Sequence, residues 1–136
     1  MVTITAIYQG ELRCEAVHTP SGTTLPTDAP KDNQGKGESF SPTDLVATAL
    51  GTCMLTTMGI AARKYGYNID GSTVTVIKEM VATPARRIGS LQTTIMVPHV
   101  LNDEQKKKME SAALGCPVHK SLHPDIALPV TFVWAK

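Results

Sequence analysis

The sequence has few aromatic residues and no long run of basic residues, and both shortages restrict its function. Phe, Trp and Tyr make up 4% of the 136 residues, so we expect no stacking platform for nucleobases or sugars. The net charge is +1, and the longest basic run is Lys106-Lys107-Lys108. Because this run falls on one predicted helix, it is explained as a solvated face, and binding to nucleic acid is not expected.

The first residues do not show the pattern of a secretory leader, and the sequence has only three cysteines. Residues 1–8 alternate like a strand, without a basic segment followed by an apolar run, so we expect no signal peptide and a cytoplasmic location. Cysteines in the cytoplasm are normally thiols. Any disulfide here would therefore be catalytic or sensing rather than structural.

Charge is absent from residues 45–62. Length and composition would permit a membrane span, but four threonines and two glycines dilute the segment. We therefore expect no membrane span, and instead a helix over residues 41–65 that is buried by protein on all sides. Ala47 and Gly51 give this helix one face that another backbone could approach closely, and a second subunit could supply it.

The ends of this helix are marked by residues that favour a start and a stop. Ser41 suits the N-cap and Pro42 the first helical position, and Asp44 can reach back as a shortened capping box. Gly66 is expected to end the helix.

The whole pattern predicts one α+β domain over residues 1–136, with mostly antiparallel sheets and no βαβ alternation. Strands are expected in residues 1–40, with a turn at Gln9-Gly10-Glu11, and the segment after Thr27 is a polar, glycine-bearing loop. The predicted elements beyond the central helix are a hairpin at 70–98, helices within 102–122 and a last strand at 128–135.

One cysteine is expected at the start of a helix and another in the middle of a helix. Whether their thiols lie close together in space decides the function. Cys116 precedes Pro117, so it is the expected N-cap of a short helix, where backbone N–H groups and nearby His119 would stabilise a thiolate. The alternative is a small residue filling a helix corner. Cys53 lies mid-helix, where desolvation raises a thiol pKa and no cation follows before Arg63.

Taken alone, Cys53 is best explained as a small core residue, and Cys14, in a predicted strand, likewise. A zinc site is a third interpretation, because Cys116, His119 and His123 have spacings that one helical turn could gather. We expect no metal site, since there is no Cys-x2-Cys pair and Pro124 follows His123.

The two cysteine segments together resemble the OsmC/Ohr family of thiol-dependent hydroperoxide reductases. The segments are Ser41-Pro-Thr-Asp-Leu-Val-Ala-Thr-Ala-Leu-Gly-Thr-Cys53-Met and Leu114-Gly-Cys116-Pro-Val-His119-Lys-Ser-Leu122, and their form is closer to the OsmC-like branch. The resemblance implies an OsmC-like fold and an intertwined homodimer with paired central helices and active sites at the subunit interface. It implies no cofactor.

The resemblance also implies a role for each site residue. Cys53 would be the peroxidatic thiolate and Cys116 the resolving thiol, with an arginine from the N-terminal strands charging Cys53. Arg13 is the candidate for that arginine. The glutamate that holds it in the family falls on Thr43 here, and Glu38 could substitute.

The function implied is a two-cysteine peroxidase of oxidative or osmotic stress defence that reduces organic hydroperoxides and is recycled by an external dithiol. An apolar lining at Leu50, Met54 and Met58, with His119 nearby, would favour organic peroxides. The alternative is an OsmC-like binding or redox-sensing protein with weak or no turnover.

Overall fold

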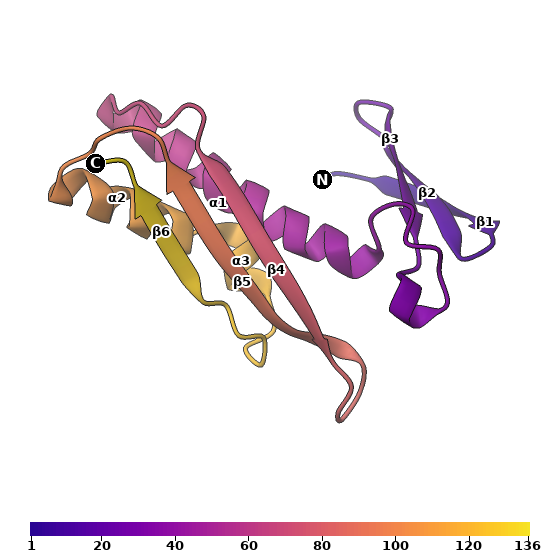
Figure 1. Ribbon diagram of the computed structural model, residues 1–136. Coiled ribbons are helices and arrows are strands. Elements are labelled where there is room, and N and C mark those ends of the chain that lie inside the picture. The colour runs from indigo at the N-terminus through magenta and orange to yellow at the C-terminus, as the bar shows by residue number, and fades with distance from the viewer. The chain divides into compact units, whose positions relative to one another are not determined.

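The computed structural model describes all 136 residues, which form two compact units, 1–46 and 47–136. We call them the N-terminal unit and the C-terminal unit. Each contains one three-stranded sheet, and the helices α1, α2 and α3 accompany the second sheet (Figure 1). The predicted α+β class is confirmed, and the expectation of a single domain stays a prediction.

The N-terminal unit is an antiparallel meander of β1 (Ile4–Gly10), β2 (Arg13–His18) and β3 (Thr23–Asp28). The first turn lies slightly later than predicted, because β1 continues through Gly10 and the positive φ angles fall on Gly10, Glu11 and Leu12. The register of β2 and β3 sets Arg13 directly opposite Asp28. The loop that follows contains one short 3-10 turn, η1 (Lys31–Asn33).

Helix α1 (Pro42–Tyr65) begins and ends as its sequence predicts. The Ser41 N–H donates to Asp44 Oδ2 at 2.9 Å, and the Asp44 N–H donates back to Ser41 Oγ at 3.1 Å, so the capping box is complete. At the other end Gly66 has a φ of +75°, which lets the Tyr67 N–H donate to the Ala62 carbonyl at 2.8 Å.

In the single chain α1 is buried along one face only. Burial of its other face by a second subunit stays a prediction. Thr52, Thr56 and Ile60 are exposed on the opposite face. By length and composition α1 could cross a membrane, but the core helix of a soluble protein passes the same test. The buried face consists of Ala47, Leu50, Gly51, Met54, Met58 and Ala62.

The face expected to receive a second helix is occupied by the chain itself. A Cβ added to Gly51 would lie 3.1 Å from methyl groups of both Val74 and Val76. Gly51 is therefore a point of close approach between α1 and β4 (Thr73–Val81). The Ala47/Gly51 face packs against its own sheet and is not free for a partner helix.

The C-terminal sheet has the order β4-β5-β6, with β5 spanning Arg87–Val97 and β6 spanning Val130–Trp134. β4 and β5 form the predicted antiparallel hairpin, whereas β6 runs parallel to β5. The connection passes through α2 (Asp103–Leu114) and α3 (Pro117–Ser121). These two helices supply the long crossover that a parallel return needs, so the chain contains one βαβ unit. The α+β class stands, because one crossover is not a βαβ alternation along the chain.

The capping box of α1 should carry a measurable share of the stability. Replacing the buried Ser41 with Ala removes the acceptor of the Asp44 N–H, so we expect a loss of about 1 kcal/mol in the free energy of unfolding. Urea denaturation measures it. Lys107→Ala, at an exposed position of α2, is the control and should change stability by less than about 0.5 kcal/mol. Equal stability of Ser41→Ala and wild type would contradict the role of the cap.

Candidate functional site

Cys116 is the N-cap of α3, as the sequence predicts. Its Sγ accepts the backbone N–H of His119 at 3.2 Å, and Pro117 occupies the first helical position. Its own N–H donates to the Ala113 carbonyl at 3.2 Å. Cys116 is 0% exposed, so its thiol belongs to the core of the C-terminal unit.

Cys53 meets Cys116 in the C-terminal unit. Both residues are free thiols, and the Cys53 side chain lies close enough to Cys116 to raise the pKa of the Cys116 thiol. Cys53 lies in α1 beside the fully buried stripe and is itself half-buried. Two thiols some sixty residues apart in sequence are thus brought together by the packing of α1 with α3.

The protonation of Cys116 differs from the sequence-based expectation. Burial raises the pKa of Cys116, and the backbone N–H of His119 opposes this rise. The neighbouring Cys53 thiol raises the pKa of Cys116 further. The expectation that the helix N-terminus would make Cys116 a ready thiolate is therefore wrong, because burial and the second thiol outweigh the backbone donors.

The predicted apolar lining lies in the core. Leu50, Met54 and Met58 are fully buried on the inner face of α1, while His119 is half-buried on α3. The backbone of His119 contributes to the site through its bond to Cys116. Contact of these four residues with a substrate stays a prediction.

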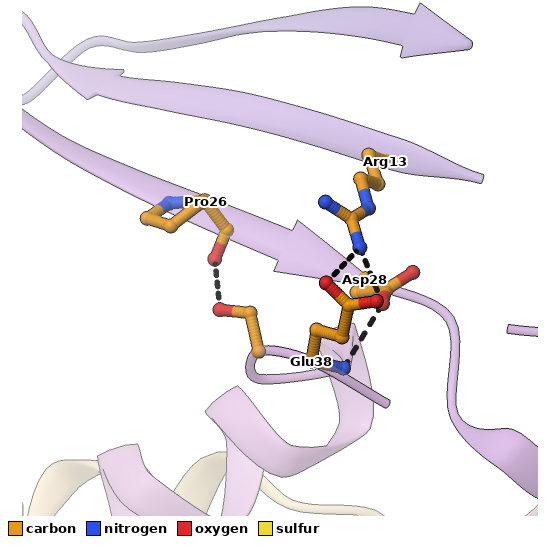
Figure 2. A network of polar contacts seen from close by, with 5 residues as sticks. Arg13, Pro26, Asp28 and Glu38 are labelled. Atoms are coloured by element: carbon orange, nitrogen blue, oxygen red, sulfur yellow. Dashed lines mark hydrogen bonds and ion pairs between the residues drawn. The ribbon is translucent and has the colours of Figure 1, made fainter. Parts of the chain in front are cut away.

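The N-terminal unit contains a polar network around Arg13 (Figure 2). Arg13 Nη2 lies 2.7 Å from Glu38 Oε2 and 3.5 Å from Asp28 Oδ2. The hydrogen bond and charge of Glu38 raise the pKa of Arg13, and the charge of Asp28 adds to the rise. Arg13 is therefore a permanent cation between two carboxylates.

The start of α1 explains why Glu38, rather than a helical acid, pairs with Arg13. The Thr43 hydroxyl lies 3.2 Å from the Ser41 hydroxyl, and the Asp44 carboxylate caps the helix. Glu38 lies on the loop before the helix, where its side chain reaches β2. The catalytic roles of Arg13 and Glu38 stay predictions.

Asp28 is the network member that the sequence analysis missed. It is buried at the end of β3, and its Oδ2 also accepts the Glu38 N–H at 3.0 Å. A signal was available, because an antiparallel pairing of residues 13–18 with 23–28 sets Arg13 opposite Asp28, and opposite charges favour such a cross-strand pair.

The residues considered for zinc are not gathered into a metal site. No group of three or more His, Cys, Asp or Glu side chains is placed to hold a metal ion. His123 is exposed, and its Nδ1 lies 3.8 Å from Asp125 Oδ2.

The fold and the adjacent free thiols define a mixed α+β protein with a dithiol site. The family model described as OsmC-like protein matches residues 35–130. The chain therefore belongs to the OsmC-like family. Among curated proteins, none matches the sequence.

Solved structures agree with this assignment. A candidate osmotic stress induced and detoxification response protein from Psychrobacter arcticus 273-4 is 48% identical, with a TM-score of 0.91 over 97% of this chain and 96% of that one. An organic hydroperoxide resistance protein OsmC from Legionella pneumophila shares the fold at 15% identity and a TM-score of 0.80, over 98% and 96% of the two chains. An OsmC-like protein from Mycoplasma pneumoniae also shares the fold, at 16% identity and a TM-score of 0.84, over 100% of this chain and 98% of that one.

The raised pKa of Cys116 predicts how stability changes with pH. A cysteine thiol usually ionises at 9.0. Above that pH the unfolded thiol loses its proton while the folded thiol keeps it, so ionisation favours the unfolded chain. The stabilising contribution is complete below pH 9.0 and is lost as the pH rises through the higher pKa of the folded state.

Urea unfolding of wild type and Cys116→Ser at about pH 7 and about pH 10 isolates this effect, since lysines and tyrosines titrate alike in both. Wild type should lose more stability between the two pH values than the serine variant, whose hydroxyl can still cap α3. Equal losses would show that burial does not hold the proton on Cys116.

Proposed function

We propose that this protein is a two-cysteine thiol peroxidase that reduces organic hydroperoxides, with Cys53 as the nucleophile. The observation that carries the proposal is the proximity of two free thiols, since the Cys53 side chain influences the pKa of Cys116. A sulfenic acid on one is thereby adjacent to a thiol that can resolve it. Family membership and structural relatives described as hydroperoxide resistance and detoxification proteins support the same chemistry.

Burial and charge favour Cys53 over Cys116 as the attacking thiol. Cys116 is fully buried and its pKa is raised, whereas Cys53 is half-buried. The thiolate is the form that attacks a peroxide. Cys116 is buried and its pKa is raised above the ordinary value, so it is suited to the later step, in which a thiol resolves the sulfenic acid.

The proposed reaction balances without a cofactor. The Cys53 thiolate attacks the distal peroxide oxygen, the O–O bond breaks, and the alkoxide takes a proton and leaves as the alcohol. Cys53 is then a sulfenic acid. The Cys116 thiol displaces its hydroxyl, which leaves as water, and a Cys53–Cys116 disulfide forms. An external dithiol reduces this disulfide by thiol–disulfide exchange.

Arg13 is our candidate for the cation that would activate Cys53, with Glu38 holding Arg13. Arg13 is protonated and paired with Glu38, as this role requires. A guanidinium beside a thiolate favours the charged form of the sulfur. We further propose a cytoplasmic location, where dithiol reductants are present.

Peroxide consumption and disulfide mapping test the function directly. With cumene hydroperoxide, wild type should lose two of its three free thiols per chain and gain a Cys53–Cys116 bridge, seen in non-reduced peptide maps. Cys53→Ser should consume no peroxide, whereas Cys14→Ser, which removes the remaining thiol, should behave as wild type. Wild-type consumption by Cys53→Ser, or the absence of the bridge, would refute the mechanism.

A binding or redox-sensing role is the second candidate, and Thr43 favours it. Thr43 stands where the family's arginine-holding glutamate would be, and it lacks a carboxylate. Thiol titration separates the two functions, because a Cys53 pKa of about 8.5 or above indicates binding and a value well below it indicates catalysis.

We also propose a homodimer formed through the exposed face of α1. Ile60 is 66% exposed on this helix, next to exposed Thr56. A charge in a helix–helix contact would have to be desolvated, so Ile60→Asp should convert the dimer to a monomer in sedimentation equilibrium. Val100→Asp, at a loop residue that is 71% exposed, is the matched control and should remain dimeric. A monomeric wild type, or a dimeric Ile60→Asp, would contradict the proposal.

A further inference from the structure

Asp28 is a buried carboxylate whose two oxygens are treated differently by their surroundings. Oδ2 accepts the Glu38 backbone N–H at 3.0 Å and lies 3.5 Å from Arg13 Nη2. Oδ1 is buried and has no hydrogen-bond partner. An unpaired buried oxygen of this kind calls for an explanation, because buried polar atoms in proteins are nearly always paired.

The two carboxylates around Arg13 differ in exposure and in the element that carries them. The Glu38 side chain is 57% exposed on a loop, and it makes the shorter contact. The Asp28 side chain is 1% exposed and fixed on β3, directly opposite Arg13 in the strand register. Both contacts use the same guanidinium nitrogen, Nη2.

We propose that Asp28 is the positioning residue of Arg13 and the alternative acceptor for its guanidinium. When the Glu38 side chain releases Arg13, the guanidinium turns to Asp28 and donates two hydrogen bonds, one to Oδ2 and one to Oδ1. Arg13 thus exchanges between a Glu38-bound and an Asp28-bound arrangement without leaving the end of β2.

The chemistry of the groups supports this exchange. A guanidinium has five N–H donors in a fixed fork, so donors remain beyond the nitrogen that now contacts both acids. Arginine and carboxylate form strong bidentate pairs, and such a pair would satisfy the unpartnered Oδ1. The backbone bond from Glu38 to Asp28 keeps the loop close, so Glu38 can return.

This inference rests on the proposed function for its meaning, since it names the residue that keeps the activating cation in place while Glu38 moves. If the protein is the proposed peroxidase, Asp28→Asn should lower kcat/KM for cumene hydroperoxide at least tenfold, mainly through kcat. The control is Ser39→Ala. It removes another hydrogen bond between this loop and β3, the one that the Ser39 hydroxyl donates to the Pro26 carbonyl at 3.0 Å (Figure 2). It should leave kcat/KM within about twofold.

Nitrogen-15 NMR of the Arg13 side chain tests the exchange without depending on peroxidase activity. The Arg13→Lys variant assigns the signals by their loss. In Glu38→Gln we expect separate, sharp Nη1 and Nη2 resonances, because a bidentate pair with Asp28 stops rotation of the guanidinium. In the double variant Asp28→Asn/Glu38→Gln these should merge into one averaged resonance.

The outcomes separate the two proposals. Averaged, solvent-like Arg13 signals in Glu38→Gln would overturn the role of Asp28, even if wild type reduces peroxide. Separate signals in that variant would support it, even if no peroxidase activity is found. Because Glu38 is exposed, this variant is expected to fold, and its backbone amide spectrum checks that it does.

Discussion

The packing of α1 on its own sheet is the constraint on which the dithiol site depends. Gly51 allows the helix to approach Val74 and Val76 so closely that a Cβ would be tight, and this contact fixes which face of the helix is buried. Cys53 then lies at the margin of that face, half-buried and near enough to the Cys116 thiol to raise its pKa. A Cβ at Gly51 would require the side chains of Val74 and Val76 to give by a few tenths of an ångström.

The two units hold different reactive or charged groups. The C-terminal unit holds two free thiols whose environments differ, since burial keeps Cys116 protonated while Cys53 lies nearer the surface. The N-terminal unit holds a permanent cation, Arg13, between a buried carboxylate and an exposed one. The helix that carries Cys53 has no basic residue until its last turn, so the proposed peroxidatic role of Cys53 requires a cation from outside this helix.

Local signals made much of the fold predictable from the sequence. The alternation of apolar and polar residues predicted the strands, and capping residues such as Ser41 and Gly66 marked the ends of α1. The pairing of the strands was harder to predict, because the parallel pairing of β5 with β6 depends on tertiary packing. For the site, the N-cap position of Cys116 followed from Pro117, but its pKa did not, since burial is a property of the fold. Asp28 was missed because its partner is set by strand register.

Trapping of the sulfenic acid tests most directly whether Cys53 is the nucleophile. In a Cys116→Ser variant the intermediate has no thiol to resolve it, so one equivalent of cumene hydroperoxide followed by dimedone should label Cys53, as read by peptide mass spectrometry. The reciprocal Cys53→Ser variant should remain unlabelled at the buried Cys116. Dimedone on Cys116 in that variant, with none on Cys53 in the other, would contradict the account.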